Sequence, residues 1–246
     1  MNNKVIYTSL TNHYDKLPQY DIIDPSFDYI CFTNDYPEGT KIGQWLILPI
    51  PFEHKNPIHM SRYAKILPHK VLTQYEWSVW LDANVIIKSS KIYDCINTCI
   101  NRNQLWSGLQ HPRFDCIYQD INECIRNGRI KYYEGRRQLN LLEQAGYPRH
   151  NGLFENNVII RKHNESSIID ISTLWWEYFV NYVPRDQFSL FFVFWKYNFR
   201  PSLILEPHQN TRNMESIKWI FHNKKSIYKR IIRKLRILGN KLKLNY

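Results

Sequence analysis

The sequence lacks several features that would place it in a specialised class of protein. Its longest apolar run, Phe188 to Trp195 with Ser189 inside it, is far shorter than the roughly 20 residues that a helix needs to cross a bilayer. The first four residues lead directly into a strand-like stretch, without the long apolar region of a signal peptide, so we expect a cytoplasmic protein. With 43% hydrophobic and 15% aromatic residues, the chain is globular rather than disordered.

Paired cysteines are also missing. The five cysteines include no Cys-x-x-Cys pair, and Cys95 and Cys99 have no second pair or nearby histidine to complete a zinc site. We therefore expect reduced, mostly buried thiols. No internal repeat, low-complexity segment or clear linker occurs before about residue 215, so residues 1–214 are expected to form one domain and residues 215–246 a tail.

Acidic residues are absent from the end of the chain. After His222 there are nine lysines and arginines and no aspartate or glutamate, so nine of the net charge of +11 belong to this tail and the first 223 residues carry +2. Apolar residues recur among these cations at spacings of four, four and three: Ile227, Ile231, Leu235 and Leu238. The pattern predicts a basic amphipathic helix on an anionic membrane surface. Nucleic acid is the less favoured partner, because the body lacks a broad basic surface.

Strand-like and helix-like stretches alternate along the rest of the chain. Strands are expected over residues 5–8, 29–33, 45–48, 77–87, 105–109 and 152–160. Helices are expected over residues 57–69, 91–102, 117–144 (two helices around Gly128), 166–182 and 186–197. This alternation predicts an α/β fold with a mostly parallel sheet that helices cover on both faces.

The stretch from Trp77 to Ile87 is the expected central strand, and it contains Asp82 and Asn84. Two residues apart on an extended chain, these side chains point the same way, at the strand end where open α/β sheets bind ligands. Their oxygens suit Mn²⁺ or Mg²⁺. Asp-x-Asn also begins ordinary turns, but the β-branched run Val85–Ile87 is expected to carry the chain back into the sheet.

Eight short motifs occur in a characteristic order between about residues 5 and 200. They are Tyr14-Asp15-Lys16-Leu17, Tyr29 to Asn34, Ser61 to His69, Trp80 to Asn84, His111-Pro112, Gly152 to Glu155, Trp175 to Glu177 and Arg185 to Gln187. Together they resemble a glycosyltransferase-like family of the GT-A type, found in plant Golgi proteins linked to wall and mucilage polysaccharides and in bacterial polysaccharide loci. The resemblance implies a Rossmann-type domain that binds a nucleotide-diphosphate sugar. Its partner would be a glycan or lipid-linked glycan acceptor.

The sequence departs from many GT-A enzymes at one position of this pattern. Asn84 stands where they have a second aspartate. An amide still offers a carbonyl oxygen to a hard cation, although it adds no charge. In related enzymes a late histidine often completes the metal site, which points to His222; His208 and His222 are each also compatible with a surface position.

The donor would be held by cations and by residues after the first strands. Arg62 and Lys65, three apart on one helix face, are assigned to the diphosphate together with Asp82; a solvated helix face is the alternative. The nucleobase is expected near four further residues: Thr8, Tyr14, Asp15 and Thr33.

Two carboxylates are candidates for the catalytic base. Asp186 is the first choice, although a helix N-cap is the alternative. Glu155 is the second choice, and a buried or paired structural glutamate is equally compatible with its apolar neighbours. The expected protein is a metal-assisted glycosyltransferase of a growing surface glycan, at the inner face of the cell membrane. One rival is a nucleotide-sugar hydrolase or pyrophosphorylase, of which the missing Gly-rich loop disfavours the pyrophosphorylase. The other is a non-catalytic nucleotide- or nucleic-acid-binding module.

Overall fold

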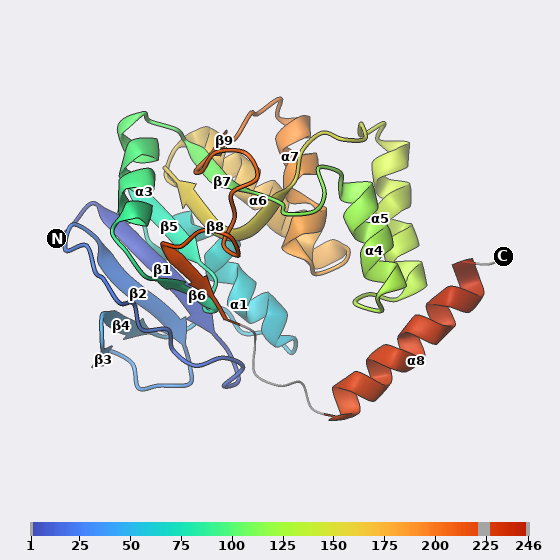
Figure 1. The fold of residues 1–246 in the computed structure, drawn as a ribbon, viewed down its shortest axis with the longest axis horizontal. Coiled ribbons are helices and arrows are strands. Elements are labelled where there is room, and N and C mark those ends of the chain that lie inside the picture. Colours follow the sequence, from blue (N-terminus) through green and yellow to red (C-terminus); the bar gives the residue numbers. More distant parts are fainter. Residues whose placement is uncertain (1, 221–226, 245–246) are drawn as a thin grey trace.

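An eight-stranded mixed sheet forms the centre of the computed structural model, which describes residues 2–220 and 227–244 (Figure 1). Its strands run in the order β3-β4-β2-β1-β5-β8-β7-β9. Their bounds are β1 Lys4–Leu10, β2 Asp28–Thr33, β3 Lys41–Ile42, β4 Trp45–Leu48, β5 Trp77–Leu81, β7 Trp106–Gln110, β8 Phe154–Arg161 and β9 Ser202–Leu203. β1 pairs in parallel with β2 and β5, β2 with β4, and β7 with β9, whereas β8 is antiparallel to both neighbours and β3 is antiparallel to β4. The predicted mostly parallel α/β fold is confirmed.

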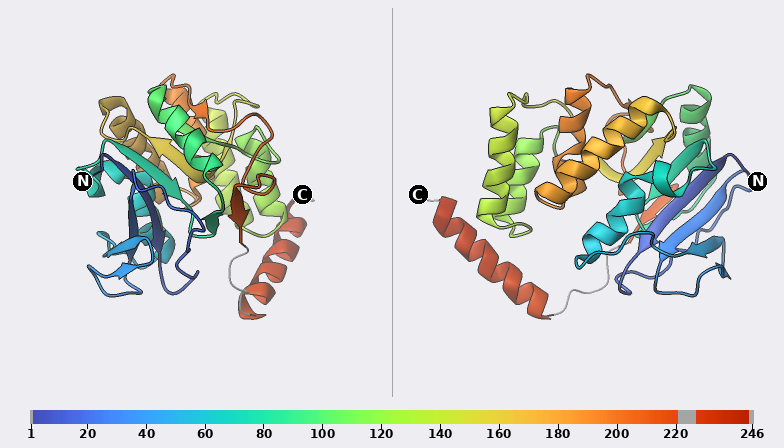
Figure 2. Two further views of the ribbon diagram at one scale, coloured as in Figure 1. Left: turned by 60° about the vertical axis from the view of Figure 1, so that its left-hand side comes forward. Right: turned by 180° about the vertical axis from the view of Figure 1, so that it is seen from behind.

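Helices lie on both faces of this sheet (Figure 2). Their bounds are α1 Pro57–Ile66, α2 Pro68–Val71, α3 Lys91–Asn101, α4 Ile117–Arg126, α5 Tyr132–Gln144, α6 Ser166–Asn181, the 3-10 turn η1 Asp186–Phe188, α7 Leu190–Lys196 and α8 Ile227–Leu244. α1 and α6 pack together on one face, and α3 lies on the other. α4 and α5 form a pair beside the sheet.

Alternating side chains of the central strands fill two separate cores. Tyr7 and Trp80 point into the core beneath α1 and α6, and Ile6 and Val79 point into the core beneath α3. Because both faces of the sheet are covered, the central strands β1 and β5 are buried at nearly every position.

Local sequence sets the ends of the helices that lead to the site. Asn56 caps α1 by accepting a hydrogen bond from the Ile58 amide, and Pro57 occupies the first turn. Pro68 ends α1 and starts α2, as the sequence predicts. The predicted break between α4 and α5 occurs at Gly128, whose φ of +67° suits glycine.

The stretch after Asp82 differs from the expectation. The Val85 amide donates to the Asp82 carbonyl (2.8 Å), which closes a turn, and β6 (Val85–Ile87) then leaves the main sheet. β6 pairs instead with β10 (Ile217–Trp219) in a two-stranded antiparallel sheet. The prediction that Val85–Ile87 continues the main sheet is therefore wrong, because a partner 130 residues away in sequence was needed to define the pairing.

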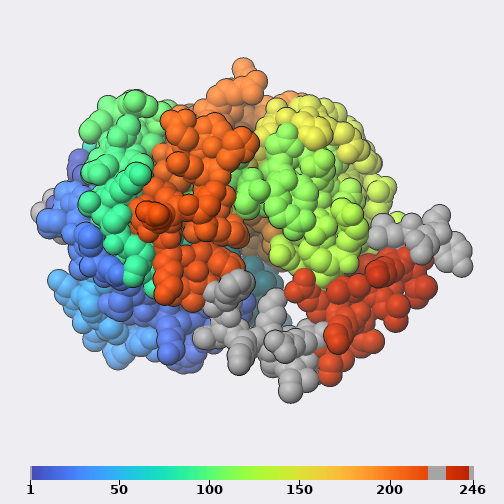
Figure 3. All heavy atoms as spheres, viewed as in Figure 1, coloured from blue at the N-terminus to red at the C-terminus, as the bar shows by residue number. Residues whose placement is uncertain are grey.

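The predicted basic amphipathic helix is present as α8, which lies beside the ends of α4 and α5 and otherwise projects from the body (Figures 1 and 3). None of the helices in residues 2–220 and 227–244 is both long enough and apolar enough to cross a bilayer.

Candidate active site

Asp82 immediately follows β5, so it lies at the carboxyl end of the central strand. Its Oδ1 accepts a hydrogen bond from Trp80 Nε1 (2.7 Å) and lies 3.2 Å from Lys65 Nζ. The carboxylate therefore has a fixed orientation, although one quarter of its side chain is exposed. Trp80 could not be assigned to the site from the sequence, since a tryptophan in a buried strand is usually a core residue.

Lys65 lies at the centre of the candidate site. Its side chain is 1% exposed, and Nζ lies 2.6 Å from Asp186 Oδ2 as well as 3.2 Å from Asp82 Oδ1. Arg62 Nε lies 3.7 Å from the same Asp186 oxygen. The two cations of α1 thus converge on one carboxylate, and the alternative of a solvated helix face is wrong for Lys65.

Asp186 pairs with these cations instead of capping a helix. Arg185 and Ser189 occupy the N-cap positions of η1 and α7, so the N-cap alternative for Asp186 is wrong. Burial would raise the pKa of Asp186, but the cations around it outweigh burial, Lys65 most of all, and lower the pKa to about 2. Asp186 is consequently ionised at neutral pH and is a weak proton acceptor.

A buried arginine fixes the end of α1 that carries Lys65. Arg161, fully buried near the end of β8, donates to the backbone carbonyls of Lys65 and Ile66 and to the Tyr7 hydroxyl (2.6 Å). A cation at this position complements the unpaired carbonyls at a helix C-terminus. Sequence reasoning missed Arg161, because it ends the apolar run of β8 and is followed at once by Lys162, as at an ordinary strand terminus.

Glu155 approaches the same site from the start of β8. It forms an ion pair with Arg212 and accepts a hydrogen bond from Thr211 Oγ1 (3.4 Å). Burial raises the pKa of Glu155, Arg212 opposes that rise, and the nearby charge of Asp82 adds to it. Arg212 and Thr211 come from the loop before β10, and no pattern in the sequence places that loop beside Glu155.

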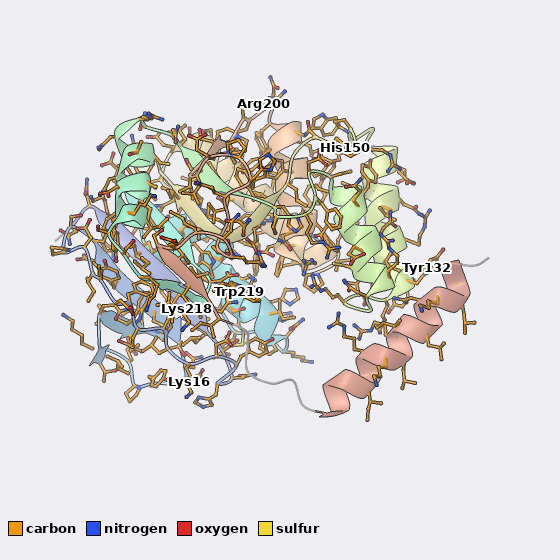
Figure 4. The ribbon with its side chains drawn as sticks, in the orientation of Figure 1. Lys16, Tyr132, His150, Arg200, Lys218 and Trp219 are labelled. Atoms are coloured by element: carbon orange, nitrogen blue, oxygen red, sulfur yellow. The ribbon has the colours of Figure 1, made fainter. Side chains whose placement is uncertain are left out.

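Asn84 joins the turn after β5 to the end of β10. Its Nδ2 donates to the Ile220 carbonyl (3.1 Å), and the Ile220 amide donates to the Asn84 backbone carbonyl (2.8 Å). Asn84 Oδ1 is buried and has no hydrogen-bond donor among the described residues, so it is available as a hard oxygen ligand. Trp219, labelled in Figure 4, lies beneath the Arg212 guanidinium at 4.9 Å from the ring centroid.

The described residues contain no group of three or more His, Cys, Asp or Glu side chains arranged to hold a metal. His222, the third predicted metal ligand, lies outside the described residues. His208 is exposed on the loop after β9. Asp82 and Asn84 fit a hard cation by their chemistry, since one is a partly exposed carboxylate and the other has a buried free carbonyl oxygen.

The residues predicted to contact the nucleobase lie on β1, on β2 and in the loop after β1. Thr8 and Thr33 are buried within the sheet, and Thr33 Oγ1 accepts from the Asp35 amide (2.9 Å). Tyr14 is 45% exposed; burial and Asp15 raise its pKa, whereas nearby Arg62 lowers it. Tyr14 therefore lies on the Arg62 side of the site.

A second polar group borders Glu155 and draws Arg185, Gln187 and His111 from two of the ordered motifs. Arg185 donates to Gln187, which in turn donates to the Glu155 backbone carbonyl (3.0 Å), and Arg185 lies 3.7 Å from the buried carboxylate of Asp120. Burial lowers the pKa of neighbouring His111 to about 4, so its ring is neutral at physiological pH.

Comparison with known proteins gives a family and two similar structures. A family model described as TOD1/MUCI70, glycosyltransferase-like domain, matches residues 24–221. The apo structure of the bifunctional glycosyltransferase WbbM has a TM-score of 0.45 at 10% identity, covering 82% of this chain, which spans 38% of WbbM. The galactosyltransferase LgtC, solved with donor and acceptor sugar analogs, has a TM-score of 0.43 at 12% identity, covering 76% of this chain and 69% of its own. No curated protein matches the sequence.

The family match covers most of the chain, including the Asp82 turn, both catalytic-base candidates and the helix that carries Arg62 and Lys65. It confirms the resemblance seen in the ordered motifs. The chain belongs to the TOD1/MUCI70 glycosyltransferase-like domain family.

Proposed function

We propose that this protein transfers a sugar from a nucleotide-diphosphate sugar to a growing surface glycan, such as a capsule, an O-antigen or a lipooligosaccharide. The observation that carries the proposal is the buried Lys65 ammonium between Asp82 and Asp186 at the carboxyl end of β5. Ligands of open α/β sheets bind at this end. A fixed cation there suits a reaction in which a diphosphate leaves with growing negative charge.

The two cations of α1 would have different tasks. Arg62, with 28% of its side chain exposed, can turn its planar guanidinium towards phosphate oxygens. Lys65 is too buried to reach far, so it would supply a fixed positive charge behind the diphosphate. Asp186 would act as a positioning residue, because its ion pair holds Lys65 in place.

A divalent cation, Mn²⁺ or Mg²⁺, would be held by Asp82, by Asn84 Oδ1 and by His222. When bound, such a cation neutralises charge on the leaving diphosphate. The free, buried Asn84 Oδ1 supports this assignment, since buried carbonyl oxygens normally have a partner.

Of the two carboxylates that the sequence offers for the catalytic base, we prefer Glu155. A general base works best when its pKa lies near the working pH. The pKa of Glu155 is raised by burial, whereas that of Asp186 is lowered to about 2. Release of Glu155 from Arg212 when the acceptor binds would free the carboxylate to accept the hydroxyl proton.

The proposal includes a location. The enzyme would work in the cytoplasm at the inner face of the cell membrane, where α8 contacts anionic lipid and the acceptor is a lipid-linked glycan. The basic and amphipathic composition of α8 supports this location.

A thermal-shift panel tests the donor site. Nucleotide diphosphates and nucleotide sugars are added with and without Mn²⁺ to the wild type, to Asp82→Ala, and to Asp94→Ala, an exposed control on α3. A ligand at 100 times its dissociation constant raises the free energy of unfolding by about 2.7 kcal/mol. For a chain of this size, Tm then rises by about 5–10 °C. We expect one nucleotide to give a Mn²⁺-dependent shift that Asp82→Ala loses and Asp94→Ala keeps. No shift with any nucleotide would favour a non-catalytic nucleic-acid-binding module or a donor outside the panel.

A further inference from the structure

Asn240 joins α8 to the body of the protein. This side chain is buried, and its Nδ2 donates to the backbone carbonyls of Ile125 (2.7 Å) and Ile130 (3.0 Å). Its Oδ1 accepts from the Tyr132 amide (2.9 Å), and Tyr132 lies beside α8 in Figure 4. One side chain thus bonds to a carbonyl at the end of α4, to a carbonyl of the α4–α5 loop and to the first amide of α5, which has no partner within its own helix.

Two arginines on the same side of α8 extend this contact. Arg233 Nε donates to the Asn127 carbonyl (2.8 Å), and Arg236 Nη1 donates to the Arg129 carbonyl (3.2 Å). The approach is close at Gly128, where an added Cβ would lie 2.7 Å from Ile237 Cγ1. Cations at the C-terminal end of α4 also complement its dipole.

Four apolar side chains of α8 lie on the opposite side, whereas Ile232 and Ile237 are partly buried. Ile231, Leu235, Leu238 and Leu242 are 51%, 63%, 59% and 61% exposed. At 100° per residue, the centre of this apolar stripe lies about 180° around the helix from Asn240. A surface helix normally turns its apolar face to the core, so α8 has the reverse arrangement.

The residues around the apolar stripe formed by Ile231, Leu235, Leu238 and Leu242 indicate which partner it contacts. Lys234, Lys241 and Lys243 are exposed on α8, and α8 contains no acidic residue. Apolar residues bordered by lysines match the acyl boundary and the anionic headgroups of a membrane surface. Nucleic acid would match the cations but leave the four apolar side chains in water.

We infer that a clamp formed by Asn240, Arg233 and Arg236 holds α8 in one orientation on the α4–α5 corner, with its apolar stripe lying in an anionic membrane surface. The bilayer thereby meets a defined side of the molecule, so the site at the end of β5 has a fixed direction relative to the membrane. The clamp and the membrane contact do not depend on the proposed function. Only their role, which is to present the site to a lipid-linked acceptor, rests on it.

Vesicle binding tests the outward side of α8. The full chain is mixed with vesicles of phosphatidylcholine alone or with one quarter phosphatidylglycerol, and bound protein is measured by flotation. We expect binding to the anionic vesicles that falls at least ten-fold in the Leu235→Ser/Leu238→Ser variant. The control, Ile22→Ser/Ile23→Ser, removes two exposed apolar residues elsewhere and should bind like the wild type. Equal binding by all three proteins, or a dimer that only the leucine variant loses, would overturn the membrane contact.

Hydrogen exchange tests the clamp. In Asn240→Ala the Tyr132 amide loses its acceptor, so we expect faster exchange there and at the α4–α5 corner, while vesicle binding persists. If that variant does not fold, exchange at the α4–α5 corner is measured in Arg233→Gln/Arg236→Gln, which loses the bonds to the Asn127 and Arg129 carbonyls. Unchanged exchange in a folded variant would overturn the clamp. Failure of the proposed function would appear separately, as a missing nucleotide shift in a protein that still binds vesicles.

Discussion

Replacing Lys65 by methionine tests whether the buried ammonium holds the candidate site together. The change keeps most of the side-chain volume and removes the charge between Asp82 and Asp186, which lie 3.2 and 2.6 Å from Nζ. Asp186 then remains ionised in a buried position with Arg62 as its nearest cation, at 3.7 Å. Leaving one partner of a buried pair unpaired typically costs about 3–5 kcal/mol.

Because Arg62 still offsets part of that charge, we expect the free energy of unfolding to fall by about 3 kcal/mol, the lower end of the range. Tm should then fall by about 6–12 °C. The loss depends on pH. In the wild type the pKa of Asp186 is lowered to about 2 from an ordinary value of 3.8, so the pair stabilises the fold above about pH 4 and is lost as the pH falls towards 2. In the variant Lys65 no longer offsets burial, so we expect the pKa of Asp186 to be higher than in the wild type and the penalty to shrink as the pH falls.

Circular dichroism melts at about pH 7 and pH 4 measure the effect. Lys88→Met, which breaks an exposed pair with Asp21, is the matched control and should change stability by less than about 1 kcal/mol. Adding Asp186→Asn to Lys65→Met should recover stability, because the uncompensated charge is gone. The reasoning is refuted if Lys65→Met unfolds like the control, or if the double variant is no more stable than Lys65→Met.

Two further changes probe the donor site and the backbone. Arg62→Ala should lower kcat/KM for the donor about 10- to 100-fold, as expected for a lost charge-assisted hydrogen bond. Arg102→Ala, at the exposed end of α3, is the control and should have wild-type kinetics. Equal kinetics in both variants would contradict the assignment of Arg62 to the diphosphate. Gly152→Ala should lower the free energy of unfolding, measured by urea denaturation, by about 1–3 kcal/mol, because Gly152 has φ of +91° and an added Cβ would lie 2.6 Å from Phe191. Gly239→Ala, which meets open space in α8, is the control, and equal midpoints would exclude strain at Gly152.

The order of elements could be predicted from the sequence because local patterns carry it. Apolar β-branched runs, separated by stretches of helical spacing, predicted β1, β2, β4, β5, β7 and β8. Pro68 and Gly128 correctly predicted where α1 and α4 end. Short strands such as β10 and the pairing of β6 escaped prediction, since three residues carry almost no periodic signal and the partner strand is distant in sequence.

The sequence by itself determined which residue types reach the carboxyl end of β5: Arg62, Lys65 and Asp82 belong to motifs whose spacing is local, and α8 is amphipathic from its own periodicity. The tertiary structure alone decided how these groups are paired. Lys65 is buried against Asp186, Arg161 fixes the end of α1, and Arg212 reaches Glu155 from a loop. It also decided that α8 docks through Asn240 and turns its apolar stripe outward. Ion pairs and helix docking join residues far apart in the chain, so their geometry and pKa values follow from packing and burial, which local sequence does not encode.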